Sequence, residues 1–170
     1  MTQPVLTTAR LVLRPFQADD IDPLHTLLSD VEAMRYWGPH QTRTETEAFV
    51  RGTMAAPPAI TCDFVIERDG AVIGKAGMWQ APEIGFFVSP AHQRQGVARE
   101  ALGVVIPHLF SVYDMPALTA DVDPRNDASR ACLAAMGFRE TGWATQTIEI
   151  MGEWCDSVYL ALPRSVWAGC

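Results

Sequence analysis

The stretch that most constrains the fold is a strand, a loop with one glycine and a helix, which together span residues 83–110. Glu83–Val88 is apolar and rich in aromatic residues, and Ser89-Pro90 ends it because proline cannot continue a central strand ladder. Apolar residues then recur at helical spacing, at Ala98, Ala101, Leu102, Val105, Leu109 and Phe110. The pattern predicts a helix from about Gln95 to Val112, which Pro107 should kink or fray in its last turn.

The loop before this helix, Gln93–Ala98, has features that suit an anion. A helix start leaves backbone N–H groups without partners at the positive end of the helix dipole, where phosphate groups bind readily. Gly96 lets the backbone approach such a ligand, and Arg94 and Arg99 can add charge-assisted contacts. A plain strand-to-helix turn that needs one glycine explains the same residues, since the loop has neither a glycine-rich dinucleotide motif nor a P-loop.

Length and composition limit the classes to which the protein can belong. A chain of 170 residues, 48% hydrophobic and 19% charged, is typical of one globular domain over residues 1–170. The formal net charge of −7 argues against nucleic acid as a partner and suits a cationic substrate such as an amine. No apolar run reaches the length of a transmembrane helix and the first residues lack a signal-peptide core, so we expect no membrane partner and a cytoplasmic location.

The cysteines and histidines do not form a recognisable metal motif. The four cysteines have no CxxC spacing, and the four histidines have no metal-ligand spacing. These residues are Cys62, Cys132, Cys155, Cys170, His25, His40, His92 and His108. We therefore expect reduced thiols, no disulfide framework and no bound metal.

The rest of the chain alternates between strand and helix patterns. Strands are predicted at Arg10–Phe16, Ile60–Glu67, Val72–Trp79 and Ala117–Val122, with two more inside Phe138–Leu162. Helices are predicted from a cap at Asp19 or Asp20 to about Ser29, at Thr44–Thr53 and at Asp127–Met136. Asp69-Gly70 predicts a tight hairpin, Thr44 and Glu47 are spaced as a capping box, and Gly137 suits a helix C-cap. A helical crossover makes the 117–122 strand parallel to the 83–88 strand.

The order of these elements, together with three motifs, resembles the GNAT superfamily of N-acyltransferases, and its RimJ/RimL-type branch in particular. Gln93–Ala98 fits the family's Q/R-x-x-G-x-G/A pyrophosphate loop, and Asn126–Ser129 with Gly137-Phe138 fits its N-x-x-S…G-F segment. Gly152–Tyr159 resembles the closing hairpin of the branch. The resemblance implies an α+β GNAT fold: a mixed, mostly antiparallel central sheet of about seven strands, about four flanking helices and a splayed parallel strand pair.

The resemblance further implies an acetyl-CoA-dependent N-acetyltransferase with acetyl-CoA as cosubstrate and no metal. Backbone N–H groups of Gln93–Ala98 would hold the CoA pyrophosphate, and the backbone of Phe86–Val88 would pair with the pantetheine arm like an added strand. An N–H near Phe87 or Val88 would polarise the thioester carbonyl. The residues implied in cofactor binding are Phe86, Phe87, Val88, Gln93, Arg94, Gln95, Gly96, Val97, Ala98, Arg99, Asn126 and Ser129.

Two side chains are candidates for catalysis, and each has a structural alternative. A general base is needed because an amine is mostly protonated at neutral pH, and related family members place a carboxylate on the strand that Glu83 opens. The alternative for Glu83 is a solvated charge at a strand end. Ser129 would be the general acid, because Leu133 stands where many members have a tyrosine. Ser129 can instead bond its own helix backbone, and a third possibility is that no protein acid is used.

Asn126 and the aromatic residues also allow two interpretations. Asn126 would bond the pantetheine arm or the backbone of the site, and its alternative is a helix N-cap or turn residue. The aromatic residues either line the acceptor side or pack in the core and rim; they are Tyr36, Trp37, Trp79, Trp143, Trp154 and Tyr159.

The enzyme hypothesis has one competitor from another functional class. Because Leu133 replaces the usual tyrosine, the chain could be a catalytically weak acyl-CoA-binding or regulatory module on a GNAT scaffold. For the enzyme, the RimJ/RimL likeness favours a peptide N-terminus, that is a protein N-terminal α-amine, as acceptor, with a small-molecule amine as the other choice. The family resemblance is also compatible with a homodimer.

Overall fold

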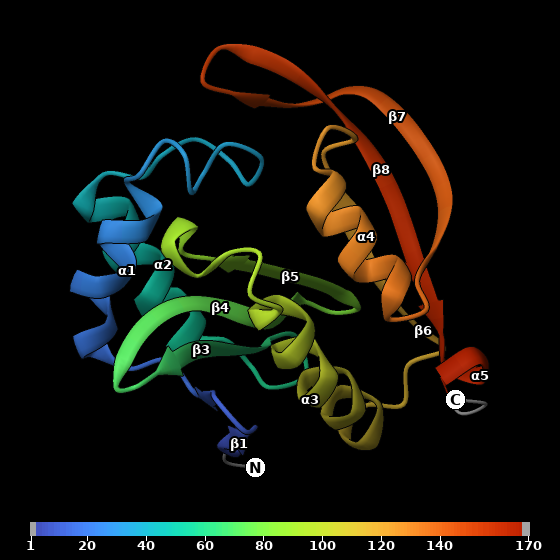
Figure 1. Ribbon diagram of the computed structural model, residues 1–170, viewed down its shortest axis with the longest axis horizontal. Coiled ribbons are helices and arrows are strands. Elements are labelled where there is room, and N and C mark those ends of the chain that lie inside the picture. The colour runs from blue at the N-terminus through green and yellow to red at the C-terminus, as the bar shows by residue number, and fades with distance from the viewer. Residues whose placement is uncertain (1–2, 168–170) are drawn as a thin grey trace.

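The computed structural model describes residues 3–167, which form one eight-stranded mixed sheet with helices on both faces (Figure 1). The strands are β1 (Leu6–Thr7), β2 (Val12–Arg14), β3 (Cys62–Arg68), β4 (Ala71–Gln80), β5 (Glu83–Val88), β6 (Ala117–Val122), β7 (Arg139–Ile150) and β8 (Glu153–Pro163). The helices are α1 (Ile21–Leu28), α2 (Arg43–Ala55), α3 (Val97–Val112), α4 (Asp127–Ala135) and α5 (Arg164–Trp167), with short 3-10 turns η1 (Ala18–Asp20) and η2 (Pro90–His92). No helix within residues 3–167 is long and apolar enough to cross a membrane.

The sheet has the order β1-β2-β3-β4-β5-β6-β8-β7, and β5 and β6 are its parallel pair. All other neighbouring strands are antiparallel. This confirms the predicted mixed, mostly antiparallel sheet with one parallel pair. The sheet has one strand more than the predicted seven because Leu6–Thr7 forms a short edge strand beside β2.

Two tight turns define the long hairpins of the sheet. Asp69 and Gly70 join β3 to β4 with φ of 52° and 78°, and Met151 and Gly152 join β7 to β8 with φ of 50° and 82°. Positive φ at both central residues is the geometry of a type I′ turn, whose twist matches that of the flanking strands. The Asp-Gly prediction is therefore confirmed, and the β7–β8 hairpin extends far beyond the rest of the sheet (Figure 1).

One prediction about a helix detail, the position of the capping box, was wrong. The capping box of α2 is formed by Thr42 and Glu45, not by Thr44 and Glu47, and the Thr42 N–H donates to the Glu45 carboxylate at 2.7 Å. The Thr-x-x-Glu spacing occurs twice in this segment, so the spacing does not choose between them. Pro107 lies inside α3, which ends at Val112 as predicted and has its apolar face buried.

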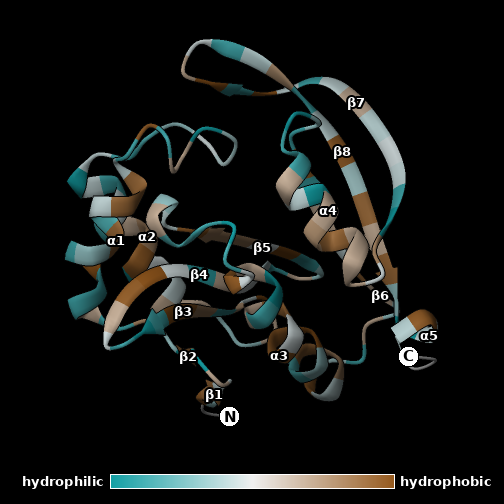
Figure 2. Cartoon of the chain, in the orientation of Figure 1, coloured by the Kyte–Doolittle hydropathy of each residue, from teal (hydrophilic) through white to brown (hydrophobic). Residues whose placement is uncertain are grey.

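Side chains alternate across the strands and fill two separate clusters. Phe64 and Ile66 of β3 pack on the face covered by α3, whereas Val65, between them, packs with α1 and α2 on the other face. Figure 2 shows hydrophobic colour along much of the sheet and mixed hydrophobic and hydrophilic colours on the helices that cover it. The sheet that contains the parallel pair is therefore covered by α3 on one face and by α1 and α2 on the other.

Arg14 fixes the first part of the chain to the sheet. Its guanidinium donates to both carboxylate oxygens of Asp20, at 2.7 and 2.8 Å, and to Glu67 at 2.8 Å. The Arg14 and Asp20 side chains are largely buried, and paired arginine–carboxylate forks of this kind hold a fixed geometry. The pair orients η1 and thereby the start of α1.

Candidate active site

The parallel strands β5 and β6 separate almost as soon as they begin. Glu83 and Thr119 are their single pair of facing residues, and the Thr119 N–H donates to the Pro82 carbonyl at 3.0 Å. β5 remains paired with β4 along its length, and β6 remains paired with β8. The backbone of 84–88 therefore has an open edge toward β6, which is the splayed arrangement predicted for this pair.

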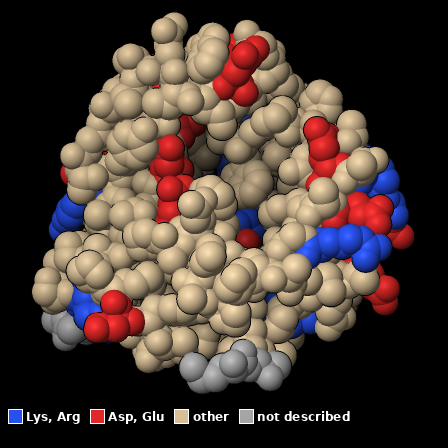
Figure 3. Space-filling model, turned by 180° about the vertical axis from the view of Figure 1, so that it is seen from behind, with Lys and Arg blue, Asp and Glu red and all other residues tan. Residues whose placement is uncertain are grey.

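A narrow cleft occupies the space between the separated strands. Its hollow is about 50 Å³, and it is bounded by the segment before α2, by β5, by β6 and by the first turns of α4. The residues that line it are Tyr36, Trp37, Ile84, Gly85, Phe86, Ala120, Asp121, Val122, Asn126, Ser129 and Leu133. From the side opposite to Figure 1 the surface is hollowed near its middle, with acidic side chains beside the hollow (Figure 3).

The loop Gln93–Ala98 connects the end of β5 to α3. Arg94 and Gly96 have φ of 58° and 76°, so the chain makes a left-handed turn directly before the helix. Within residues 3–167, the backbone N–H groups of 94–98 have no protein acceptor, and Gln93–Gly96 is exposed. Such a row of free N–H groups at a helix start is the arrangement that binds phosphate.

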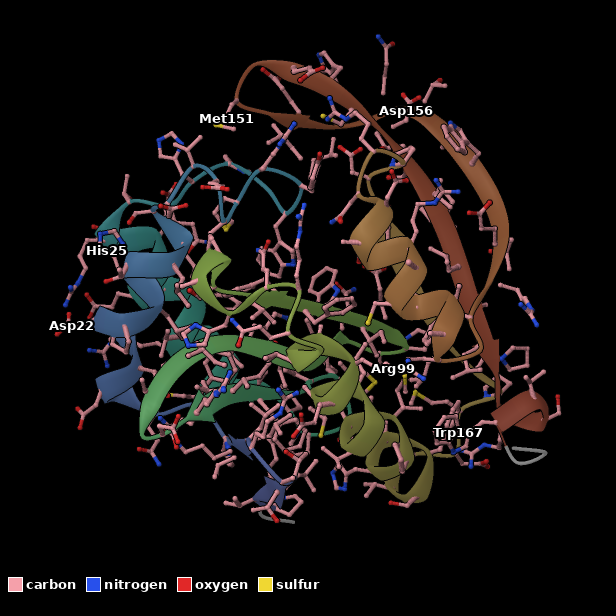
Figure 4. The ribbon with its side chains drawn as sticks, in the orientation of Figure 1. Asp22, His25, Arg99, Met151, Asp156 and Trp167 are labelled. Atoms are coloured by element: carbon pink, nitrogen blue, oxygen red, sulfur yellow. The ribbon has the colours of Figure 1, made fainter. Side chains whose placement is uncertain are left out.

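The side chains of the loop serve different purposes. Gln93 Nε2 donates to the Val88 carbonyl at 2.9 Å, and the side chain of Val97 is buried in the core. Val97 can therefore meet a ligand only through its backbone. Arg99 lies in the first turn of α3 on the side toward α4 (Figure 4), and its charge faces Cys132, whose pKa burial raises.

Two of the three residues predicted to meet the pantetheine arm have buried side chains. Phe87 and Val88 are each 7% exposed, and Phe87 packs edge-on against Trp37 with ring centroids 5.0 Å apart. Phe86 lines the cleft. The open strand edge is thus rigidly supported from behind, which suits strand-like pairing with an extended ligand.

Glu83 lies half-buried at the point where the strands part. Its carboxylate accepts a hydrogen bond from Trp79 Nε1 at 3.1 Å. Burial raises the pKa of Glu83, the Trp79 bond opposes that shift, and the nearby charge of Asp121 adds to it. A half-buried carboxylate with a raised pKa at this position is compatible with the predicted role of a general base.

The predicted partners on α4 lie across the cleft from β5. Asn126 is the N-cap of α4, and its side chain accepts from the Ser129 N–H at 3.1 Å. Asn126 therefore has the capping role and lines the cleft as well. The Ser129 hydroxyl forms no hydrogen bond within the described residues, and Leu133, fully buried, closes the cleft beside it.

A buried ion pair that the sequence did not reveal lies beneath the site. Lys75 Nζ and Asp63 Oδ2 are 2.8 Å apart, and both side chains are buried. Lys75 also lies over the ring of Trp37, 5.1 Å from its centroid, and near Gly85 of the cleft. The available signal was a single lysine in the predominantly apolar strand β4, with an aspartate two positions from its directly opposed residue, Val65, on the neighbouring strand.

Arg125 joins three elements at the rim of the cleft. It donates to Asp123 at 2.7 Å and to Glu153 at 3.0 Å, and it lies over the ring of Tyr36 at 5.9 Å. Burial opposes ionisation of Asp123, but the hydrogen bonds from Arg125 lower its pKa. The β7–β8 hairpin, which carries Met151 and Asp156 in Figure 4, is tied in this way to the end of β6.

Only some of the candidate aromatic residues reach the cleft. Tyr36 and Trp37 line it, and Trp79 bonds Glu83. Trp143 and Trp154 are each 56% exposed on the β7–β8 hairpin and do not line it. Residues 3–167 contain no group of three or more His, Cys, Asp and Glu side chains placed to hold a metal ion, and Cys170 lies outside the described residues.

Comparisons with known proteins identify the class to which this fold and site belong. Residues 10–139 match the family model described as the acetyltransferase (GNAT) domain. The chain is 26% identical to the uncharacterized N-acetyltransferase YnaD of Bacillus subtilis, over 95% of this chain and 98% of that protein. It is also 26% identical to spermidine N(1)-acetyltransferase of Escherichia coli, over 88% and 84%.

A solved structure supports the same conclusion for the fold. RimL, a ribosomal L7/L12 alpha-N-protein acetyltransferase in complex with coenzyme A, is similar with a TM-score of 0.83 and 17% identity, over 96% of this chain and 99% of that one. This chain belongs to the GNAT acetyltransferase family. The predicted family, fold and enzyme class are confirmed.

Proposed function

We propose that this chain is a single-domain enzyme that transfers an acetyl group from acetyl-CoA to a primary amine by direct attack, with a protein N-terminal α-amine as its acceptor. The observation that carries the proposal is the separation of β5 from β6 beyond Glu83 and Thr119. It opens a track that begins at the exposed loop 93–98 and ends at a half-buried carboxylate.

Acetyl-CoA would lie along this track as an extended substrate. The free N–H groups of 94–98, with Arg94 and Arg99 nearby, would hold its pyrophosphate. The pantetheine arm would pair with the backbone of Phe86–Val88, and Asn126 would contact it from α4. The thioester would then lie at the open edge of β5, across the cleft from Ser129.

The transfer itself needs a neutral amine and a leaving thiolate. The amine nitrogen attacks the thioester carbon, the carbonyl oxygen takes up negative charge, and an N–H near Phe87 or Val88 stabilises that charge. Glu83, directly or through water, removes the proton that the amine nitrogen carries. When the carbon–sulfur bond breaks, the CoA thiolate accepts a proton from solvent, either directly or through the Ser129 hydroxyl, which takes up a solvent proton as it gives up its own.

The acceptor would enter from the face that carries Glu83. Asp121 and Tyr159 are paired across β6 and β8 on that face, and Asp121 is exposed. A second carboxylate near Glu83 attracts cationic acceptors, which favours a polyamine as the second candidate. The chain is similar both to a spermidine N(1)-acetyltransferase and to an alpha-N-protein acetyltransferase, so the two acceptors are tested side by side.

The test incubates the purified protein with acetyl-CoA and a panel of peptides, spermidine and monoamines while free thiol is measured. Thiol release that requires an acceptor, with the mass of one acetyl group added to that acceptor, supports the proposal. Thiol release only with polyamines would identify a polyamine, the second candidate, as the acceptor. Absence of release with every acceptor, together with absence of CoA binding in calorimetry, rejects the proposal.

The competing function is a catalytically weak acyl-CoA-binding module. Leu133 in place of a tyrosine motivates it, and it predicts CoA binding in calorimetry without acceptor-dependent thiol release. Homodimerisation and a cytoplasmic location belong to the same proposal. Sedimentation of the purified protein tests the first, and fractionation of the source cells tests the second.

A further inference from the structure

Two arginines from distant parts of the chain converge on one residue of the phosphate loop. Arg10, between β1 and β2, donates from Nη2 to the backbone carbonyl of Gln95 at 3.0 Å. Arg68, the last residue of β3, donates from Nη1 to the side-chain oxygen of Gln95 at 2.8 Å. Hydrogen bonds from a charged donor are stronger than those between neutral groups, so both contacts restrict the loop.

Arg10 is itself held in place by the helix that the loop precedes. Its Nε donates to the Glu100 carboxylate at 2.7 Å, and the Thr8 hydroxyl donates to the same carboxylate at 2.5 Å. Glu100 belongs to the first turn of α3. The turn between β1 and β2 thus contacts α3 through Glu100 and the loop through Gln95, which gives the opening residues of the chain a place at the site.

The contact with Arg10 has a direct geometric consequence for the backbone. The Gln95 carbonyl and the Gly96 N–H belong to one planar trans peptide group, in which they point in opposite directions. A carbonyl held toward Arg10 therefore keeps the Gly96 N–H turned away from Arg10. The side-chain nitrogen Nε2 of Gln95 donates to the Ala91 carbonyl at 3.0 Å, and its side-chain oxygen accepts from Arg68. Both polar atoms of the Gln95 side chain are therefore hydrogen-bonded.

We propose that Arg10 and Arg68 are positioning residues that hold Gln95, and through it the free N–H groups of 94–98, in the orientation that binds the phosphate end of the donor. This inference rests on the proposed function, because it assigns the loop to acetyl-CoA. Arg10 acts on the main chain of Gln95, whereas Arg68 acts on its side chain. The two contributions can therefore be separated by substitution of Gln95.

The experiment compares acetyl-CoA with S-acetyl-pantetheine, a donor that lacks the pyrophosphate and the nucleotide. Arg68→Ala should raise the KM for acetyl-CoA about tenfold with kcat preserved, because one hydrogen bond to a charged group is lost. The KM for S-acetyl-pantetheine should not change. Arg51→Ala, which removes a surface ion pair of α2 with Glu47, is the matched control and should change neither constant.

A double-mutant cycle identifies the route of the effect. In a Gln95→Met background, Arg68→Ala should cause no further rise in KM, because its acceptor is gone. Arg10→Ala should still raise KM in that background, because its acceptor is the main-chain carbonyl. Arg68→Lys should restore part of the loss, and thermal melts of all variants identify any that do not fold.

Three results would overturn the inference. The first is an unchanged KM for acetyl-CoA in folded Arg10→Ala and Arg68→Ala. The second is an equal rise in KM for both donors, which marks general damage to the fold. The third is a full Arg68→Ala effect in the Gln95→Met background, which means that Arg68 contacts the phosphates itself. Absence of CoA binding by the wild type would instead remove the proposed function, and this role with it.

Discussion

At the scale of single residues, Glu83 carries the chemistry of the proposed mechanism. Glu83→Gln keeps the shape and the bond with Trp79 but removes the base, so kcat should fall about 10²- to 10⁴-fold. The KM for acetyl-CoA should stay close to the wild-type value. Steady-state kinetics with a saturating acceptor measure both, and Glu47→Gln on the surface of α2 is the control.

The pH profile makes the same prediction sharper. Burial raises the pKa of Glu83 above that of an ordinary glutamate, and the base acts only when ionised, so kcat/KM should fall as the pH drops through this raised value. Trp79→Phe removes a hydrogen bond that favours the carboxylate, and this acidic limb should then move to higher pH. A profile with the same limb in wild type and Glu83→Gln would rule out Glu83 as the base.

The ion pair beneath the cleft is a second prediction at residue scale. Lys75→Met or Asp63→Leu alone leaves one buried charge without its partner and should lower the free energy of unfolding by about 3–5 kcal/mol. The double variant should be more stable than either single one, because no isolated charge remains. Urea denaturation of the wild type, the two single variants and the double variant measures this cycle. If the loss of unfolding free energy in the double variant equals the sum of the two single losses, the two residues are not coupled.

At the scale of elements, β4 determines how closely β5 is held. A Cβ atom at position 74 would collide with the carbonyl oxygen of Phe87, so Gly74→Ala must displace β5 where the pantetheine arm would bind. We expect a loss of about 1–3 kcal/mol in stability, as for other overpacked sites, and a higher Kd for CoA. Calorimetric titration with CoA and urea denaturation measure the two effects.

A second glycine provides the control for that prediction. A Cβ atom at Gly103 in α3 would meet nothing within 4 Å. Gly103→Ala should therefore stabilise the helix by up to about 1 kcal/mol, since alanine loses less backbone entropy than glycine. Its Kd for CoA should equal that of the wild type. If the Kd of Gly74→Ala for CoA also equals that of the wild type, the spacing of β4 and β5 does not affect the donor site.

At the scale of the whole molecule, the sheet consists of two halves that meet at one residue pair. β1–β5 form one half and β6, β8 and β7 form the other, with Glu83 and Thr119 between them. A donor bound in the cleft contacts both halves, so CoA should slow amide hydrogen exchange in β5 and in β6 together. Exchange measured by mass spectrometry tests this. Protection confined to the loop 93–98 would place the donor outside the cleft.

Most of the element order followed from local patterns. Asp69-Gly70 predicted a hairpin because few residue pairs accept two positive φ angles, and the apolar spacing of residues 98–110 predicted α3. The capping residues of α2 did not follow, because two equivalent spacings compete there. α3 ends at Val112 as predicted, with Pro107 inside it and its apolar face buried, so the effect of Pro107 on the last turn stays a prediction.

By itself the sequence determined the loop Gln93–Ala98, the strand before it and the helix after it, because these depend on neighbours in the chain. Only the tertiary structure decided which distant groups reach the site. Arg10 and Arg68 meet Gln95 across 85 and 27 positions, and Lys75 meets Asp63 across 12. Such contacts depend on register and packing between strands, which no local pattern encodes.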